Sequence, residues 1–172
     1  MLPRRRVPVA TADFFSEEAV VFLFQHLQPE CVLIDPVVTG RDQLFRLFGD
    51  VFEDLRVLSS GAVVERSLKE REAILSTGIG QGWAIPHAQI PGVGRLLMAA
   101  SVHPQGIAYP AVDQSPVRLV FCLIGDRKTA ADHLAGLARM ARLARQAEAL
   151  ERLVKAASPQ AFIDTLKAIE EG

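Results

Sequence analysis

The sequence predicts an α/β domain: a mixed β-sheet flanked by helices in a three-layer sandwich. Leu96–Val102 and Val117–Ile124 are continuous apolar runs of strand length, as expected for central strands that helices cover on both faces. Segments whose apolar residues recur at helical spacing lie before and after these runs along the chain. The chain has 172 residues, 49% of them hydrophobic, which suits one domain with a sizeable core.

The first residues, 1–27, are interpreted as an N-terminal extension that precedes the domain at 28–172. Ser16 can cap a short helix that runs through Leu27, and Pro29 ends it. We expect this helix to pack on the domain. An element that contacts a partner protein or a membrane surface is the alternative.

A targeting signal is not indicated near the N-terminus. Arg4–Arg6 resemble the basic start of a signal peptide, but Asp13 and Glu17 interrupt the stretch that would have to be apolar. The later apolar run Ala19–Phe24 has six residues, whereas a helix needs roughly 20 to span a bilayer. We therefore expect a cytoplasmic protein that is not integral to a membrane.

The first half of the domain predicts a strand followed by two helices. Cys31–Ile34 has the composition of a short strand. Thr39 and Asp42 form a capping-box-like start to a helix whose apolar positions recur through Leu55. Residues 62–74 contain good helix formers and predict the second helix.

Glycine and proline interrupt the next segment, Thr77–Ala88, which we expect to be a loop or an irregular strand. After the two apolar runs, Ala130–Arg145 predicts a helix that turns its apolar residues inward. Those residues are Leu134, Leu137, Ala138, Ala141 and Leu143. Glu148–Ala156 predicts another helix, and Ser158–Pro159 begins a last one with a cap followed by proline.

Charge and cysteine content argue against several classes of function. The chain has 19 basic and 20 acidic residues, so its net charge of −1 gives no electrostatic footprint for nucleic acid. Cys31 and Cys122 are far apart and belong to no CxxC pair. Neither a zinc site nor a disulfide framework is indicated, as is usual in a reducing cytosol.

His87 is the leading candidate for chemistry. It follows a glycine-punctuated segment and Pro86, so its backbone is constrained and its ring can be presented at a surface. An unperturbed histidine has a pKa of about 6.5. Much of the imidazole is therefore neutral at cellular pH, as a nitrogen nucleophile must be.

Other interpretations of the sequence find less support in its spacing. The glycines of Gly78–Gly82 match neither GxGxxG nor GxxxxGK[ST], and Pro86 stands where a helix would have to follow. Cys122 lies inside an apolar run, which indicates an inert core thiol rather than a nucleophile. A metal site would need companions for His87. The other histidines are all distant in the sequence: His26, His103 and His133.

The segment Glu70–Ala88, EREAILSTGIGQGWAIPHA, resembles the signature of the fructose/mannitol-type enzyme IIA family of the bacterial phosphotransferase system. That family includes a nitrogen-regulatory IIA subgroup. Three further stretches follow in the family's order: Pro29–Asp35, Asp113–Phe121 and Asp132–Leu134. The resemblance covers roughly residues 28–170, the enzyme IIA type-2-like domain.

This resemblance implies that His87 accepts a phosphate from the histidine phosphocarrier protein and passes it to a cysteine of a IIB protein. It also implies that Arg71, sixteen residues before His87, and His133 belong to the same site. We expect no cofactor and no metal.

The chemistry of phosphoryl transfer agrees with these roles, because such catalysis is mostly positioning and charge stabilisation. Arg71 offers planar donors matched to phosphate oxygens. Ser76 and Thr77 are candidates for further phosphate-stabilising donors in a glycine-rich turn. Trp83, four residues before His87, is either a core-filling aromatic or a hydrophobic anchor that contacts partner proteins.

The resemblance leaves two functions open. The first is a phosphoryl carrier in sugar uptake, which acts through a separate IIB protein. The alternative is a standalone regulatory IIA of the nitrogen type, which binds target proteins according to its phosphorylation state. A degenerate domain used only for protein binding is a third interpretation, and the retention of Arg71, His87 and His133 argues against it.

Overall fold

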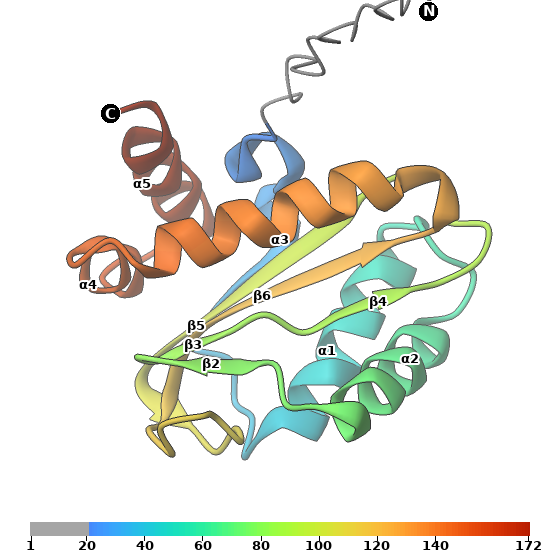
Figure 1. The fold of residues 1–172 in the computed structure, drawn as a ribbon, viewed down its shortest axis with the longest axis horizontal. Helices are drawn as coiled ribbons and strands as arrows, with labels where there is room; N and C mark the ends of the chain where they lie inside the picture. Colours follow the sequence, from blue (N-terminus) through green and yellow to red (C-terminus); the bar gives the residue numbers. More distant parts are fainter. Residues whose placement is uncertain (1–20) are drawn as a thin grey trace, which may run out of the picture.

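The computed structural model describes residues 21–172, in which one mixed β-sheet lies between two layers of helices (Figure 1). The strand order is β1-β5-β6-β3-β2, and β4 also pairs with β6. The strands are β1 Val32–Ile34, β2 Gly78–Gly80, β3 Trp83–Ala84, β4 His87–Gln89, β5 Leu97–Ile107 and β6 Val117–Gly125.

The centre of the sheet is the antiparallel pair β5 and β6, the two apolar runs of the sequence. Strand β6 is buried at every position except Arg118, so helices cover it on both faces as predicted. Strand β1 runs parallel to β5, and both β3 and β4 run parallel to β6. Because β3 and β4 share one neighbour, the chain between them stays against β6, where the N–H of Leu123 donates to the carbonyl of Pro86.

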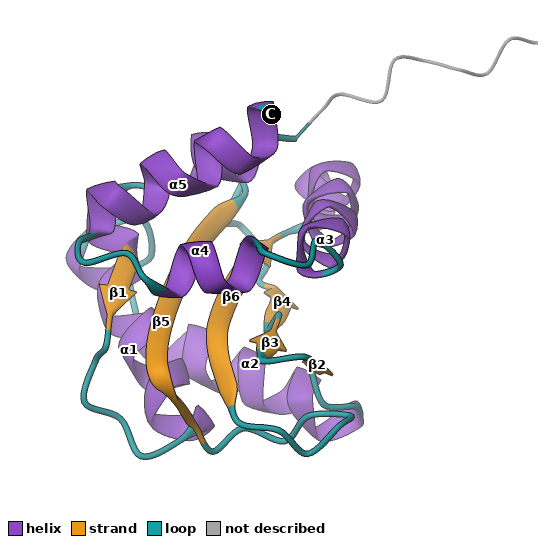
Figure 2. Cartoon of the chain, turned by 90° about the vertical axis from the view of Figure 1, so that its left-hand side faces the viewer, coloured by secondary structure: helices purple, strands orange, loops and turns teal. Residues whose placement is uncertain are grey.

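Helices α1 and α2 cover one face of the sheet, and α3, α4 and α5 cover the other (Figure 2). Their bounds are α1 Arg41–Asp54, α2 Gly61–Ile74, α3 Ala130–Ala144, α4 Ala149–Val154 and α5 Pro159–Glu171. Three short 3₁₀ helices are η1 Leu23–His26, η2 Pro29–Cys31 and η3 Arg127–Thr129. The predicted three-layer sandwich is confirmed.

Two glycines allow α1 and α2 to pack backbone against backbone. A Cβ on Gly49 would lie 2.3 Å from the carbonyl oxygen of Gly61, and one on Gly61 would lie 2.5 Å from that of Gly49. Only glycine permits this approach, since real Cβ contacts are never so short. The crossing sets the position of α2, which carries Arg71.

The predicted cap of α1 is wrong. The helix begins at Arg41 with Gly40 as its N-cap, and no side chain caps it. The backbone N–H of Thr39 instead donates to the side chain of Gln43, at 2.8 Å. This bond has the sense of one half of a capping box, but the acceptor is Gln43 rather than Asp42, and the Thr39 hydroxyl caps no N–H of the helix. By contrast, Ser158 does cap α5, accepting from the N–H of Ala161 at 3.1 Å.

The predicted inward face of α3 is partly wrong. Leu134 is 69% exposed, and Ala138 and Ala141 are also exposed. Leu143 is buried as predicted, and Leu137 is half-buried. The rest of the buried face consists of residues that the prediction left out, among them one histidine and one glycine: His133, Gly136, Met140 and Ala144.

Strand β5 is longer than the apolar run Leu96–Val102, since it continues to Ile107 across a register shift. Pro104 lies in the shift and has no N–H for the ladder, so the pairing with β6 resumes only at Ile107. At the N-terminus, the first part of the helix predicted from Ser16 to Leu27, residues 16–20, falls outside the described residues. Its described end forms only the 3₁₀ helix η1.

Candidate functional site

His87 begins β4, a three-residue strand that pairs in parallel with the end of β6. Its Cα partner is Leu123, and the N–H of Leu123 donates to the carbonyl of Pro86 at 3.0 Å. On the other side, the N–H of Ile85 donates to the carbonyl of Thr77 at 2.9 Å. The backbone that precedes His87 is therefore held from both sides, as its glycine and proline content predicted.

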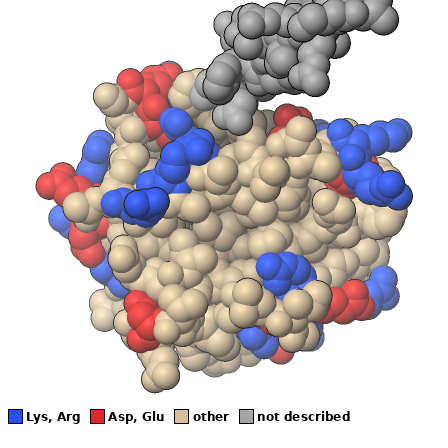
Figure 3. Space-filling model, in the orientation of Figure 1, with Lys and Arg blue, Asp and Glu red and all other residues tan. Residues whose placement is uncertain are grey.

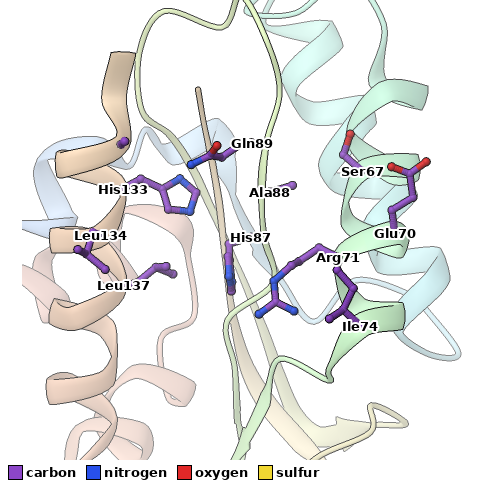
Figure 4. A pocket seen from close by; sticks show the side chains of 11 residues that line it. Ser67, Glu70, Arg71, Ile74, His87, Ala88, Gln89, His133, Leu134 and Leu137 are labelled. Carbon is purple, nitrogen blue, oxygen red and sulfur yellow. The ribbon is translucent and has the colours of Figure 1, made fainter. Parts of the chain in front are cut away.

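The ring of His87 lies in a pocket of about 540 Å³ between α2 and α3 (Figure 4). The floor of this pocket is β4, and its walls are the facing sides of the two helices. The lining residues are Ser67, Glu70, Arg71, Ile74, His87, Ala88, Gln89, Ala130, His133, Leu134 and Leu137. The pocket thus brings together three residues that the sequence singled out, although they come from three separate elements.

One ring nitrogen of His87 is engaged in a hydrogen bond. Nδ1 lies 2.8 Å from the carbonyl oxygen of Ile85, which can only accept, so Nδ1 carries the proton and donates. Nε2 therefore keeps its lone pair in the neutral ring. Burial lowers the pKa of His87 and Arg71 lowers it further, while the Ile85 carbonyl and Glu72 raise it. The net effect favours the neutral, nucleophilic form.

His133 lies beside His87. The two ring centroids are 5.8 Å apart and the planes meet at 69°, an edge-to-face arrangement. His133 is buried, and its Nδ1 has no hydrogen-bond partner. A buried N–H without an acceptor costs more than an unused lone pair. The neutral ring should therefore carry its proton on Nε2, as a donor toward the pocket.

The start of α3 fixes the ring of His133. Asp126 and Thr129 form a capping box, and the Asp126 carboxylate also accepts from the N–H of Gly94 at 2.6 Å. A Cβ on Gly125 would lie 2.8 Å from Nδ1 of His133, so glycine at this position leaves the space that the ring occupies. Burial lowers the pKa of His133, and the neighbouring His87 lowers it further.

Arg71 reaches from α2 toward His87 (Figure 4). Its Nη1 donates to the carbonyl of Leu75 at 3.1 Å, which holds the side chain against the end of its own helix. Arg71 and His87 line the same pocket, so the permanent positive charge of the guanidinium lowers the pKa of the ring. Among residues lining the pocket, Arg71 is the one group that is always cationic.

The two hydroxyl candidates do not line this pocket. The side chain of Glu72 accepts from Oγ of Ser76 at 2.9 Å and from Oγ1 of Thr77 at 2.6 Å. Thr77 is also buried. The prediction that these residues stabilise a phosphate is thus corrected: both hydroxyls are engaged with a buried carboxylate that the sequence did not single out.

Trp83 belongs to the core. It is 1% exposed and stacks on Phe121, with ring centroids 6.1 Å apart and planes at 15°. A side chain so deeply buried offers no surface to a partner protein. The prediction of Trp83 as a partner contact is therefore wrong, and the alternative, a core-filling aromatic, is the one that holds.

Sequence reasoning missed most of the pocket wall. Ser67, Arg71 and Ile74 follow one another at helical spacing, so a helical projection anchored on Arg71 could have found the α2 side. Leu134 was missed because it was assigned to the core. Gln89 follows His87 by two residues in β4, so strand alternation anchored on His87 could have found it.

Two findings concern other classes of site. Within residues 21–172, no group of three or more histidine, cysteine, aspartate or glutamate side chains is arranged to hold a metal ion. Over the same residues, none of the helices has the length and apolar character that crossing a membrane requires.

Residues 25–169 match the family described as phosphoenolpyruvate-dependent sugar phosphotransferase system, EIIA 2. The chain therefore belongs to this family of phosphotransferase components. It is 32% identical over 105 residues to a fructose-specific EIIA component of Haloferax volcanii, covering 61% of this chain and 68% of the relative. It is 31% identical over 138 residues to a nitrogen regulatory protein of Bradyrhizobium diazoefficiens, covering 80% and 90%.

Solved structures agree. Nitrogen regulatory protein IIA-Ntr of Neisseria meningitidis matches with a TM-score of 0.78 at 29% identity, covering 85% of this chain and 99% of that one. IIA mannitol of Escherichia coli matches with a TM-score of 0.67 at 17% identity, covering 81% and 98%. The latter shows the shared α/β sandwich alone.

Proposed function

We propose that this chain is a phosphoryl carrier that holds phosphate on Nε2 of His87. The observation that best supports this is the hydrogen bond from Nδ1 to the Ile85 carbonyl, at 2.8 Å. It leaves Nε2 as an unprotonated nucleophile in a pocket that also contains a guanidinium and a second imidazole. No general base is needed, since Nε2 has no proton to lose.

The transfer moves one phosphoryl group between two nucleophiles. The bond from phosphorus to Nε2 of His87 forms as the bond to the donor's nitrogen breaks, and the electron pair of that bond stays on the donor. Nδ1 keeps its proton, and the Ile85 carbonyl stabilises the positive ring that results. The reverse step delivers the group to the acceptor in the same way.

The pocket supplies the charge that such a group needs. A phosphoryl group brings close to two negative charges, and Arg71 can donate two parallel hydrogen bonds to its oxygens. His133 adds a single donor at Nε2. Arg71 and His133 act mainly by positioning the phosphoryl group and by stabilising its charge. These two effects account for most of the catalysis of phosphoryl transfer.

The rim of the pocket suits a protein partner. Ile74 on α2 is 80% exposed and Leu134 on α3 is 69% exposed, and both line the pocket. The face shown in Figure 3 carries few charged side chains in its middle. Exposed apolar side chains around a reactive group are typical of a surface that another protein covers. We propose the histidine phosphocarrier protein as the donor and a IIB cysteine as the acceptor in sugar uptake.

A related fold is found with such an acceptor. The IIA mannitol enzyme of Escherichia coli forms a complex with phosphorylated IIB mannitol, and it matches this chain with a TM-score of 0.67 at 16% identity. At that identity the likeness concerns the fold alone. It supports the proposal only in that this architecture can present a site to a phosphorylated partner.

A regulatory role is the second candidate, and the coverage of the comparisons favours it. The nitrogen regulatory protein of Bradyrhizobium matches over 80% of this chain, whereas the fructose-specific component matches over 61%. IIA-Ntr also has a higher TM-score, 0.78, than IIA mannitol, 0.67. In this case phosphate on His87 would control binding to a target protein rather than supply sugar uptake.

Phosphate incorporation tests the carrier chemistry. The chain is incubated with a phosphoenolpyruvate-driven histidine phosphocarrier, and acid-labile phosphate is located by mass spectrometry. We expect one phosphate on His87, none on His87→Ala, and normal labelling of the control His26→Ala, which lies outside the pocket. Undiminished labelling of His87→Ala would contradict the proposal.

A second experiment separates the two roles. The phosphorylated chain is mixed with IIB proteins and, in parallel, used as bait for binding partners in both phosphorylation states. Loss of phosphate to a IIB cysteine supports the sugar-uptake role. Binding that changes with phosphorylation, without such transfer, supports the regulatory role.

A further inference from the structure

A buried carboxylate lies directly behind the site. Glu72 follows Arg71 on α2, and its side chain is 2% exposed. Both of its oxygens accept from the backbone N–H of Thr77 at 3.1 Å, and Oε2 also accepts from the Thr77 hydroxyl at 2.6 Å. The hydroxyls of Ser76 and Tyr109 donate to it at 2.9 and 3.3 Å.

A chain of three hydrogen-bonded contacts connects Glu72 to the ring of His87. Glu72 holds Thr77, and the carbonyl of Thr77 accepts from the N–H of Ile85 at 2.9 Å. The carbonyl of Ile85 in turn accepts from Nδ1 of His87 at 2.8 Å. The group that sets the tautomer of His87 is thus positioned by a segment that Glu72 anchors.

The same carboxylate also anchors the segment that holds Arg71. Nη1 of Arg71 donates to the carbonyl of Leu75 at 3.1 Å. Leu75 is the first residue after α2, with extended backbone, and it directly precedes Ser76 and Thr77. Glu72 binds both of those residues, so it limits where the Leu75 carbonyl can lie.

We propose that Glu72 is a positioning residue for phosphoryl transfer, which holds the His87 ring and the Arg71 guanidinium in their working arrangement. The inference rests on the proposed role of His87 as acceptor. Glu72 lines no part of the pocket and touches no reacting atom. It positions the site through residues 75–77 and through Ile85, and its charge also raises the pKa of His87.

A carboxylate is well suited to this position. Two oxygens offer about four acceptor sites, and the N–H and the hydroxyl of Thr77 direct hydrogens toward them. Burying a charge is costly. The hydrogen bonds to Glu72 offset that cost. Arg41 offsets it further, since its Nη1 lies 3.8 Å from Oε1 of Glu72. Glutamine would direct an NH₂ group against the N–H and hydroxyl donors, so it cannot satisfy the same set.

The test compares Glu72→Gln with Glu65→Gln, a change of the same kind two turns earlier on α2, where Glu65 is half-buried, pairs with Lys69 and Arg46, and lines no part of the pocket. Two quantities are measured. The first is the ¹⁵N spectrum of the His87 ring without phosphate, which reports the population of the Nδ1–H tautomer. The second is the rate of phosphate transfer from a phosphorylated histidine phosphocarrier, resolved into kcat and KM.

For Glu72→Gln we expect the Nδ1–H tautomer of His87 to lose population and kcat to fall about 10- to 100-fold, with KM within about twofold of the wild-type value. Glu65→Gln should change neither quantity. Thr77→Val, which removes one hydroxyl and keeps the backbone, should move both in the same direction by a smaller amount. Thr77→Val therefore tests the inference if Glu72→Gln fails to fold.

An unchanged His87 spectrum together with an unchanged kcat in folded Glu72→Gln, or in Thr77→Val if only that variant folds, overturns the inference. Failure of the proposed function looks different. If His87 is not the acceptor, the wild-type chain itself acquires no phosphate on His87. The dependence of the ring spectrum on Glu72 can still be observed in that case.

Discussion

The rings of His87 on β4 and His133 on α3 meet edge to face, with their centroids 5.8 Å apart. Attack by Nε2 of His87 requires that nitrogen to be unprotonated, whereas a hydrogen bond from Nε2 of His133 to the phosphate requires that nitrogen to carry a proton. The contacts provide this difference. Ile85 holds the proton of His87 on Nδ1, and the absence of an acceptor at Nδ1 of His133 favours its proton on Nε2. One ring is thus prepared to attack and the other to donate.

His133→Ala should slow phosphoryl transfer while leaving His87 able to accept phosphate. It removes one hydrogen bond to a charged group, worth about 1.5–3 kcal/mol, or roughly 10–150-fold in rate. Rapid-quench measurement of transfer checks this. Asp132→Asn, an exposed neighbour on the same helix, is the matched control. A rate equal to that of the wild type in His133→Ala would remove His133 from the site.

Arg71→Ala should reduce the transfer rate by a similar factor, roughly 10–150-fold, since a phosphate without its cation loses a charge-assisted hydrogen bond. Arg71→Lys should recover only part of the rate, because an ammonium cannot form the planar two-bond contact. Arg66→Ala, exposed on the same helix, should transfer normally. Circular dichroism should show that all three variants fold.

Lowering the pH should stop phosphate acceptance only below about pH 6.5, because burial and Arg71 hold the pKa of His87 below that of a free histidine. Acid protonates Nε2 and removes the nucleophile. In Arg71→Gln the repulsion between the two cations is lost, so the titration midpoint of His87 should move upward. An NMR titration of the ring measures both midpoints, and an unchanged midpoint in Arg71→Gln contradicts the electrostatic account.

Trp83→Ala should destabilise the fold by about 3–5 kcal/mol, the usual cost of deleting a large aromatic from a packed core. Trp83→Phe keeps the stacking on Phe121 and should cost less. Urea unfolding provides both values. Tryptophan emission of the native chain should lie at short wavelength and shift to longer wavelength only on unfolding. Near-wild-type stability of Trp83→Ala would contradict the assignment of this residue to the core.

Acid should destabilise the protein through His103, which is 2% exposed and hydrogen-bonded to Ser101 at 2.7 Å. Burial lowers the pKa of His103 to about 4, so the unfolded chain binds a proton first as the pH falls below about 6.5. Between pH 7 and pH 5 this residue should cost about 2 kcal/mol of stability. Over the same pH interval, His103→Gln should lose about 2 kcal/mol less stability than the wild type. Denaturant unfolding at pH 7 and at pH 5 measures this difference.

The order of elements and the identity of the leading residue could be predicted from the sequence. Val117–Ile124 is apolar at nearly every position, a pattern that a strand buried on both faces requires. The good helix formers of residues 62–74 likewise predict α2 without reference to any neighbour. His87 could be singled out because glycine and proline restrict the backbone around it.

Contacts between distant segments decided the rest, because a side chain's surroundings depend on what packs against it. Trp83 is buried since β3 pairs with β6 and brings it against Phe121. Leu134 is exposed since α3 turns His133, its polar neighbour, toward the sheet. Local periodicity contains no information on which segment lies opposite. The sequence by itself therefore determined the elements and the candidate nucleophile, while the tertiary structure decided which groups surround that nucleophile.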